Sequence, residues 1–183
     1  TRQEPLERLK AEGVTSATSL ADAVGEAEVV LMCLPGGKEV EAVTRGPGGL
    51  LELVRMGQTV VDMSTAPPRL MRELAPAFQA KGVDFADAPV ARTRRAAVDG
   101  MLSIMVGSSE TVFARLKPIL ATMGTEITLC GGVGAGQVVK VMNNMVVFET
   151  TMAIAEAISI TEAAGVDGRL LFETMSKSSA DSF

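Results

Sequence analysis

The sequence contains no histidine, no tyrosine and no tryptophan among its 183 residues. The absence of histidine excludes Ser-His-Asp and Cys-His hydrolases and most zinc sites. Together with the absence of tyrosine, it also excludes any dehydrogenase that uses one of these side chains as its acid. Lysine, aspartate, glutamate and cysteine remain as possible proton carriers.

Cysteine is also scarce. The two that are present, Cys33 and Cys130, have a spacing that fits neither a zinc knuckle nor a CxxC pair. We therefore expect reduced thiols, a cytoplasmic location and no metal site. No signal peptide is visible and no apolar run reaches membrane-spanning length, so we expect no membrane association.

Positive charge is sparse, because the formal net charge is −5. One local cluster, Arg92, Arg94 and Arg95, has no aromatic residue beside it for base stacking, so we expect no nucleic-acid partner. Arginine suits bidentate recognition of a carboxylate, sulfonate or phosphate. The alternative is a solvated basic loop, and we expect at least Arg94 or Arg95 at the surface.

Apolar runs typical of buried strands alternate with helical patterns. The expected strands are 28–34, 59–63, 83–87, 102–106 and 126–130. The expected helices between and before them are 6–11, 20–24, 38–44, 49–55, 68–80 and 110–122. This alternation predicts an α/β fold with a parallel sheet covered on both faces.

The pattern changes after the last strand, because 137–164 has no strand signal and predicts one helix about 40 Å long. A further helix is expected over 169–175. We therefore expect a sheet domain at 1–133, and an interdomain helix with the start of a helical domain at 134–183. No G-x-G-x-x-G turn opens the chain, so we expect the first βα unit and most of the helical domain to be absent.

Three short motifs follow the ends of predicted strands: Leu34–Gly37, Asp62–Pro68 and Asp87–Arg94. Ligands in open α/β sheets bind at the carboxyl ends of the strands. The alternative for the first motif is an ordinary strand-to-helix turn. In the second motif, Ser64 or Thr65 is expected to cap the helix that the two prolines begin.

Lys140 and Asn144 follow the glycines of Gly134-Ala135-Gly136 by a few residues. A spacing of four places the lysine and the amide on one face of a helix, where they can hold a substrate oxygen and give it a proton. Burial and the positive end of the helix dipole both lower the pKa of such a lysine. The alternative is a lysine at the core edge whose ammonium reaches solvent.

Taken together, these motifs resemble the β-hydroxyacid dehydrogenase family, which includes 3-hydroxyisobutyrate dehydrogenase and tartronate semialdehyde reductase. The resemblance covers essentially the whole chain, and its pieces in order are Leu34-Pro35, Asp62-Met63-Ser64-Thr65, Asp87-Ala88-Pro89-Val90, Met105-Val106-Gly107 and Gly134-x-Gly136-x-x-x-Lys140-x-x-Asn143-Asn144. It implies a Rossmann-type domain that binds NAD or NADP. It also implies a long helix into an all-α domain like that of 6-phosphogluconate dehydrogenases.

The resemblance implies catalytic roles for three residues of the long helix. Lys140 would be the acid/base that protonates the carbonyl oxygen in reduction or takes the hydroxyl proton in oxidation. Asn144, together with Asn143, would orient the substrate oxygen.

The resemblance also implies a cofactor site. Leu34, Pro35 and Thr65 would line the cofactor. Arg2 would meet a 2′-phosphate, which favours NADP slightly over NAD.

One segment departs from the family pattern, because Ala91-Arg92-Thr93 stands where the family usually has Ser-Gly-Gly. This segment resembles the Gly-Arg-Thr version of sulfolactaldehyde reductases, in which the arginine binds a sulfonate. Those enzymes also have a serine where this chain has Val147. We therefore expect an anionic substrate bound by Ala91, Arg92 and Thr93, without assigning it to sulfolactaldehyde.

The expected function is hydride transfer between NAD(P) and a small anionic 3-hydroxy acid or its semialdehyde or keto form. The alternative is a non-catalytic nucleotide-binding or dimerisation module on the same fold. The long apolar helix needs a cover, so we expect a homodimer or homotetramer.

Overall fold

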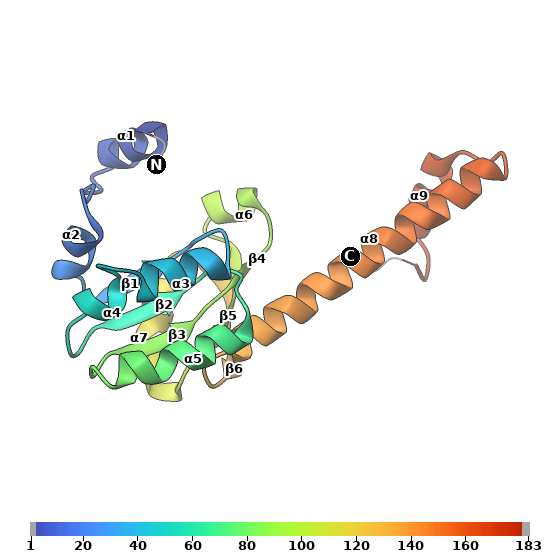
Figure 1. Cartoon of the computed structure of the whole chain (residues 1–183). Helices are drawn as coiled ribbons and strands as arrows, with labels where there is room; N and C mark the ends of the chain where they lie inside the picture. Colours follow the sequence, from blue (N-terminus) through green and yellow to red (C-terminus); the bar gives the residue numbers. More distant parts are fainter. Residues whose placement is uncertain (1–2, 181–183) are drawn as a thin grey trace. The chain divides into compact units, whose positions relative to one another are not determined.

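The structure, a computed structural model, describes residues 3–180 (Figure 1). The chain divides into two compact units, Thr1–Lys140 and Val141–Phe183. Helix α8 (Ala135–Ala163) begins in the first unit and continues in the second, which also contains α9 (Gly168–Met175). The two helices expected after the last strand are therefore confirmed.

Strands and helices alternate in the first unit as predicted. The strands are β1 (Val29–Met32), β2 (Thr59–Asp62), β3 (Asp84–Asp87), β4 (Val90–Ala91), β5 (Leu102–Gly107) and β6 (Gly124–Gly131). The helices before α8 are α1 (Gln3–Ala11), α2 (Leu20–Gly25), α3 (Gly37–Arg45), α4 (Leu50–Leu53), α5 (Pro68–Gln79), α6 (Arg94–Val98) and α7 (Glu110–Leu120). The sequence predicts all of these elements except β4 and α6, so the segment interpreted as a basic loop is partly helical.

The six strands form one sheet of mixed direction. Strands β1, β2 and β3 are parallel neighbours, with Val30 beside Val60 and Val60 beside Phe85. Strand β5 runs antiparallel to β3, where Asp87 pairs with Gly107, and β6 runs parallel to β5. The predicted parallel sheet is therefore correct for β1 to β3 and wrong for β5 and β6.

The direction changes because β3 continues through Ala88 and Pro89 into β4. Strand β4 pairs antiparallel with β5, with Val90 opposite Ile104, and the Met105 amide donates to the Pro89 carbonyl at 3.1 Å. Only the short segment that contains α6 joins β4 to β5. That connection is too short for the crossover that parallel pairing requires.

Hydrophobic clusters cover both faces of the sheet, as the continuous apolar strands predict. Adjacent residues of β2 point to opposite faces. Val60 packs in a cluster that includes Leu74 of α5, and Val61 packs in a cluster that includes Leu116 of α7. Burial on both faces explains why β2 is apolar without alternation.

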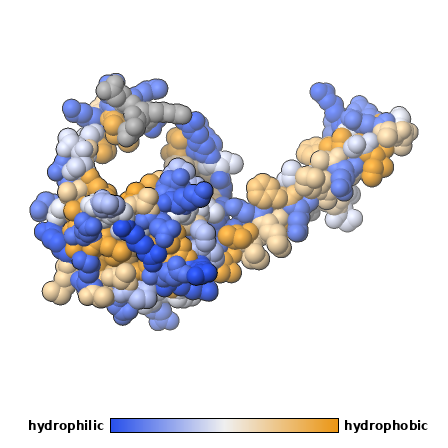
Figure 2. Space-filling view, in the orientation of Figure 1, coloured by the Kyte–Doolittle hydropathy of each residue, from blue (hydrophilic) through white to orange (hydrophobic). Residues whose placement is uncertain are grey.

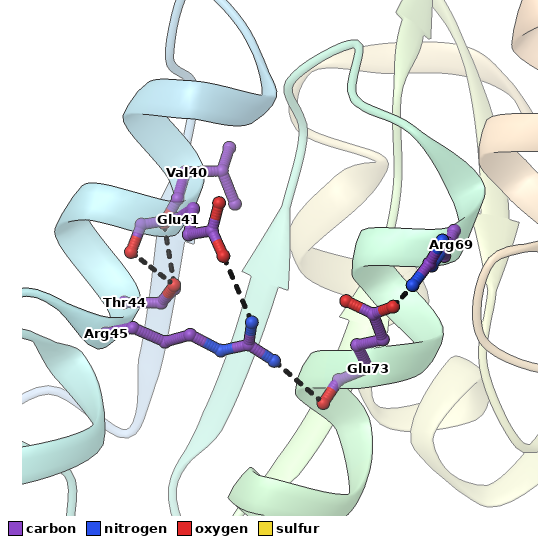
Figure 3. Close-up of polar contacts among 6 residues, drawn as sticks. All are labelled: Val40, Glu41, Thr44, Arg45, Arg69 and Glu73. Carbon is purple, nitrogen blue, oxygen red and sulfur yellow. Dashed lines mark hydrogen bonds and ion pairs between the residues drawn. The ribbon is translucent and has the colours of Figure 1, made fainter.

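Helices α3 and α5 lie side by side on one face and are joined by polar contacts (Figure 3). The Arg45 guanidinium lies 3.1 Å from the Glu41 carboxylate on its own helix and donates to the Glu73 carbonyl of α5 at 3.3 Å. Arg69 forms a second ion pair with Glu73 at 2.5 Å. Exposed pairs of this kind contribute at most about 1 kcal/mol each, so apolar packing dominates this layer.

Many apolar side chains of α8 are exposed, and its surface is largely coloured as hydrophobic in Figure 2. They include Val138, Val139, Met142, Met145, Val146, Phe148, Met152 and Ile160. By length and composition alone, α8 could cross a membrane. A single such helix is weak evidence for a span, because core helices of soluble proteins pass the same test, and α8 also carries charged residues such as Lys140 and Glu149.

The first turn of α8 packs directly on the ends of the central strands. A Cβ atom on Gly136 would stand 2.2 Å from the Met105 carbonyl oxygen and 2.8 Å from Asp87 Oδ2. Both distances are far below van der Waals contact. Glycine is therefore required where the helix meets β3 and β5.

We predict that Gly136→Ala lowers the free energy of unfolding by about 1–3 kcal/mol, because the added methyl group forces backbone apart. Urea denaturation followed by circular dichroism measures this loss. Gly132→Ala is the matched control, since a Cβ atom there meets nothing within 4 Å. Equal stability of the two variants would contradict the close packing of α8.

Candidate active site

The carboxyl ends of β1, β2 and β3 lie at one edge of the sheet because these strands are parallel. The loop after β1 carries Leu34 and Pro35, and the loop after β2 carries Thr65. Pro35 and Thr65 are exposed, whereas Leu34 is half-buried against the core. The structure thus brings the three predicted cofactor-lining residues to the edge where α/β sheets bind ligands.

Buried polar bonds join the loops after β1 and β2. The Ser64 hydroxyl accepts from the Leu34 amide at 2.9 Å, and the Ser64 amide donates to Asp62 Oδ1 at 3.0 Å. The expectation that Ser64 or Thr65 caps α5 is therefore wrong. Pro67 is the N-cap residue and makes no side-chain hydrogen bond, because the Ser64 side chain is turned toward β1.

Gln137, in the first turn of α8, connects the helix to the loop after β2. Its side chain is fully buried. Its amide nitrogen donates to the Ser64 carbonyl at 2.7 Å, and its amide oxygen accepts from the Ala66 amide at 3.0 Å. Both polar ends of the side chain are satisfied, and these bonds join the first turn of α8 to the loop after β2.

Asp87, the last residue of β3, caps the same helix from across the sheet. Its two carboxylate oxygens accept from the backbone amides of Gly134 at 2.5 Å and Gln137 at 2.8 Å. Burial raises the pKa of Asp87 to about 6, while these two hydrogen bonds act in the opposite direction. The neighbouring Asp62 carboxylate adds to the rise.

Lys140 lies one helical turn beyond Gln137 and is half-buried. Burial lowers the pKa of its ammonium group. Asn144 follows four residues later on α8 and is half-buried, and the exposed Asn143 donates from its side-chain amide to Asn144 Oδ1 at 3.4 Å. The lysine and Asn144 therefore share one helix face, as their spacing predicts.

The predicted substrate segment leads from β4 into α6. Ala91 is buried in β4, and the Thr93 hydroxyl accepts from the Ala96 amide at 3.3 Å as the N-cap of α6. Arg92 has a φ of 80°, a left-handed conformation that favours glycine. Its Nη1 atom donates to the Met101 carbonyl at 2.8 Å.

Three residues hold the strand ends and the start of α8 together, although the sequence assigns them no role: Asp62, Asp87 and Gln137. Asp62 and Asp87 end neighbouring strands and pair in register, so their position in the sequence is a signal that could have indicated them. Gln137 gives no such signal, because its partners are backbone groups of a distant loop. Arg2 lies outside the described residues.

The described residues offer no cluster of side chains that could bind a metal ion. No group of three or more aspartate, glutamate, cysteine or histidine side chains there could hold a metal ion. A groove of about 430 Å³ at the α3–α5 surface is lined by none of the predicted site residues, and its lining includes Lys38, Glu41, Arg69 and Glu73.

The chain matches sequence models of two families. Residues 1–132 match the family described as the NAD binding domain of 6-phosphogluconate dehydrogenase. Residues 134–183 match the family described as the NAD-binding domain of NADP-dependent 3-hydroxyisobutyrate dehydrogenase.

Similar proteins cover nearly all of this chain. It is 39% identical over 168 residues to 3-hydroxyisobutyrate dehydrogenase of Pseudomonas aeruginosa, which is 92% of this chain and 56% of that protein. It is 34% identical over 173 residues to 2-(hydroxymethyl)glutarate dehydrogenase of Eubacterium barkeri, which is 94% of this chain and 58% of that protein. The structure of Mycobacterium tuberculosis 3-hydroxyisobutyrate dehydrogenase with L-serine matches with a TM-score of 0.84 at 34% identity, over 93% of this chain and 58% of that one. The chain thus spans little more than half the length of these proteins.

We predict that Gln137→Met lowers the free energy of unfolding by about 2–5 kcal/mol, because it leaves the buried Ala66 amide and Ser64 carbonyl without partners. Chemical denaturation measures the loss. Gln79→Met, on the exposed surface of α5, makes the same side-chain change without burying an unpaired group. Similar losses in both variants would show that the Gln137 bonds contribute little.

Proposed function

The chain belongs to the β-hydroxyacid dehydrogenase family, and we propose that the protein containing it is an NAD(P)-dependent oxidoreductase. The reaction is hydride transfer between the nicotinamide cofactor and a small anionic 3-hydroxy acid or its semialdehyde or keto form. Support comes from the relatives, since 3-hydroxyisobutyrate and 2-(hydroxymethyl)glutarate are both anionic hydroxy acids.

One observation carries this proposal: buried bonds fix the start of α8 to the strand ends, and Lys140 follows one turn later. Gln137 binds the loop after β2, and Asp87 caps the helix from β3. A lysine at the core edge with only a solvent-facing role would need no such fixed base. The lowered pKa of Lys140 also suits a residue that both gives and takes a proton.

The loops after β1 and β2 fit a dinucleotide. The Ser64 hydroxyl joins the two loops through the Leu34 amide, and Pro35 and Thr65 are exposed at the strand ends. Leu34, Pro35 and Thr65 would hold the cofactor there. When bound, the nicotinamide supplies or accepts the hydride.

Lys140 handles the proton that accompanies the hydride. In oxidation the neutral amine accepts the proton of the substrate hydroxyl group. In reduction the ammonium group donates a proton to the carbonyl oxygen. Asn144 donates a hydrogen bond to the same oxygen, and Asn143 supports Asn144 through their side-chain contact.

Arg92 is the proposed anion-binding residue of the segment 91–93. Its Nη1 atom is anchored on the Met101 carbonyl and lies 3.4 Å from the Thr125 hydroxyl. Within the described residues, the Nε and Nη2 donors make no hydrogen bond, which leaves a fork for a carboxylate or sulfonate. Ala91 and Thr93 fix the backbone on either side of the arginine.

We predict that Lys140→Ala in the full-length protein lowers kcat by about 10²- to 10⁴-fold, as expected for loss of a general acid/base. The dissociation constant of NADH or NADPH, measured by fluorescence titration, stays within twofold of the wild type. Lys81→Ala, an exposed position after α5, is the control. Near-normal turnover of Lys140→Ala would overturn the assignment.

We predict that Arg92→Gly raises KM for an anionic hydroxy acid by roughly tenfold or more, because a charge-assisted bidentate contact is lost. Glycine also suits the φ of 80°, so unfolding measurements should find Arg92→Gly at least as stable as Arg92→Ala. The two variants separate the guanidinium group from the backbone conformation. Arg94→Ala is the exposed control, and an Arg92→Gly enzyme with unchanged KM would rule out substrate binding by Arg92.

The exposed apolar face of α8 favours the second candidate function, a dimerisation module without chemistry. The two functions differ at Lys140, which only the enzyme requires. We also propose a homodimer or homotetramer, on the same apolar face, and sedimentation of a stable monomer would contradict it.

We propose a cytoplasmic location and a slight preference for NADP over NAD. The free state of Cys33 and Cys130 is consistent with the location. The preference for NADP rests on Arg2 and is tested by comparing kcat/KM for the two cofactors in the wild type and Arg2→Ala.

A further inference from the structure

The Asp87 carboxylate sits in a cradle made by two glycines. A Cβ atom on Gly107 would stand 2.3 Å from Asp87 Oδ1, and one on Gly136 would stand 2.8 Å from Asp87 Oδ2. Any larger residue at either position would displace the carboxylate. The absence of side chains at Gly107 and Gly136 therefore leaves the space that the Asp87 carboxylate occupies.

The contacts of Asp87 require its ionised form. Each carboxylate oxygen accepts a backbone N–H, from Gly134 and from Gln137, at the positive end of α8. A protonated carboxyl would turn one oxygen into a donor facing an N–H group. One of the two cap bonds would then be lost.

The surroundings oppose this charge. Asp62, its register partner on β2, is fully buried, and its Oδ2 atom has no hydrogen-bond partner. Cys130 of β6 also lies near Asp87. Burial is the main cause that raises the pKa of its thiol, and the Asp87 carboxylate raises that pKa further. Arg72 of α5 lies against Gly134 and Lys140 lies one turn beyond Gln137, yet no cation of the described residues forms an ion pair with Asp87.

We propose that Asp87 is a positioning residue for Lys140, whose ionised carboxylate fixes the first turn of α8 and so sets where the lysine amine lies. This inference rests on the proposed function, because it assigns Asp87 an effect on the same proton transfer. Asp87 touches neither substrate nor cofactor in this role. It acts through the backbone of the helix that carries Lys140.

Helix geometry makes the effect large. A slip of one residue moves a side chain by about 1.5 Å along the axis and turns it by about 100°. Misplacement of a catalytic group by about 1 Å can lower the rate by about a hundredfold. The glycine cradle leaves little room for another side chain to replace the cap.

Asp87→Asn in the full-length protein tests the role, because asparagine keeps the shape but can accept only one of the two amides. We expect kcat to fall about a hundredfold, with the cofactor dissociation constant unchanged and faster hydrogen exchange at the Gly134 and Gln137 amides. Asp84→Asn is the control on the same strand, where the carboxylate is exposed and paired with Arg115. Unchanged kcat in Asp87→Asn would overturn the inference.

The pH profile provides a readout that a purely structural role would not move. In carbonyl reduction, protonated Lys140 is the active form, so an acid limb in kcat cannot come from Lys140. Burial raises the pKa of Asp87 to about 6 and Asp62 adds to the rise, so kcat should fall as the pH drops through this region. Asparagine at this position does not titrate, so Asp87→Asn should lose the acid limb.

The outcomes separate this inference from the proposed function. If the wild type shows no NAD(P)-dependent turnover, the proposed function fails; if Lys140→Ala retains turnover, the role of Lys140 fails, and in either case the inference falls. If Lys140→Ala is inactive but Asp87→Asn keeps the acid limb, the function stands and the positioning role of ionised Asp87 is rejected. Loss of the acid limb together with slow turnover in Asp87→Asn supports both.

Discussion

The contact between the Asp87 carboxylate and the start of α8 is the constraint on which the candidate site depends. It joins the end of β3 to two backbone amides of the helix, and Gln137 joins the same turn to the loop after β2. Both side chains are fully buried, so water cannot compete for these bonds. These bonds anchor the first turn of α8, and Lys140 lies one turn further along the helix.

The contact lies where β3 and β5 meet in antiparallel register. Because β3 runs on into β4 and pairs antiparallel with β5, Asp87 and Gly107 lie opposite each other where both strands end. The first turn of α8 then passes over that pair, close to the Met105 carbonyl. In this arrangement β5 begins beside β4, beyond the end of β3, and ends level with Asp87.

The sequence predicts the helices and strands well, but it predicts strand direction and long-range side-chain contacts less well. Continuous apolar segments such as β2 and the 29-residue helix α8 are readily recognised from their composition and length. Strand direction depends on the short β4 pairing, and two residues carry no periodic signal. Lys140 and Asn144 follow from helix spacing, whereas Gln137 and Asp87 act through contacts with residues 47 or more positions away, which spacing cannot reveal.

The left-handed backbone at Arg92 separates the shape of its loop from the identity of its side chain. The turn between β4 and α6 is held by the strand pairing and the Thr93 cap, not by residue 92 itself. Exchange between glycine and arginine at this position therefore changes the charge presented by the loop without redrawing its path. The charge of this loop therefore depends on one side chain, whereas its path depends on the residues on either side.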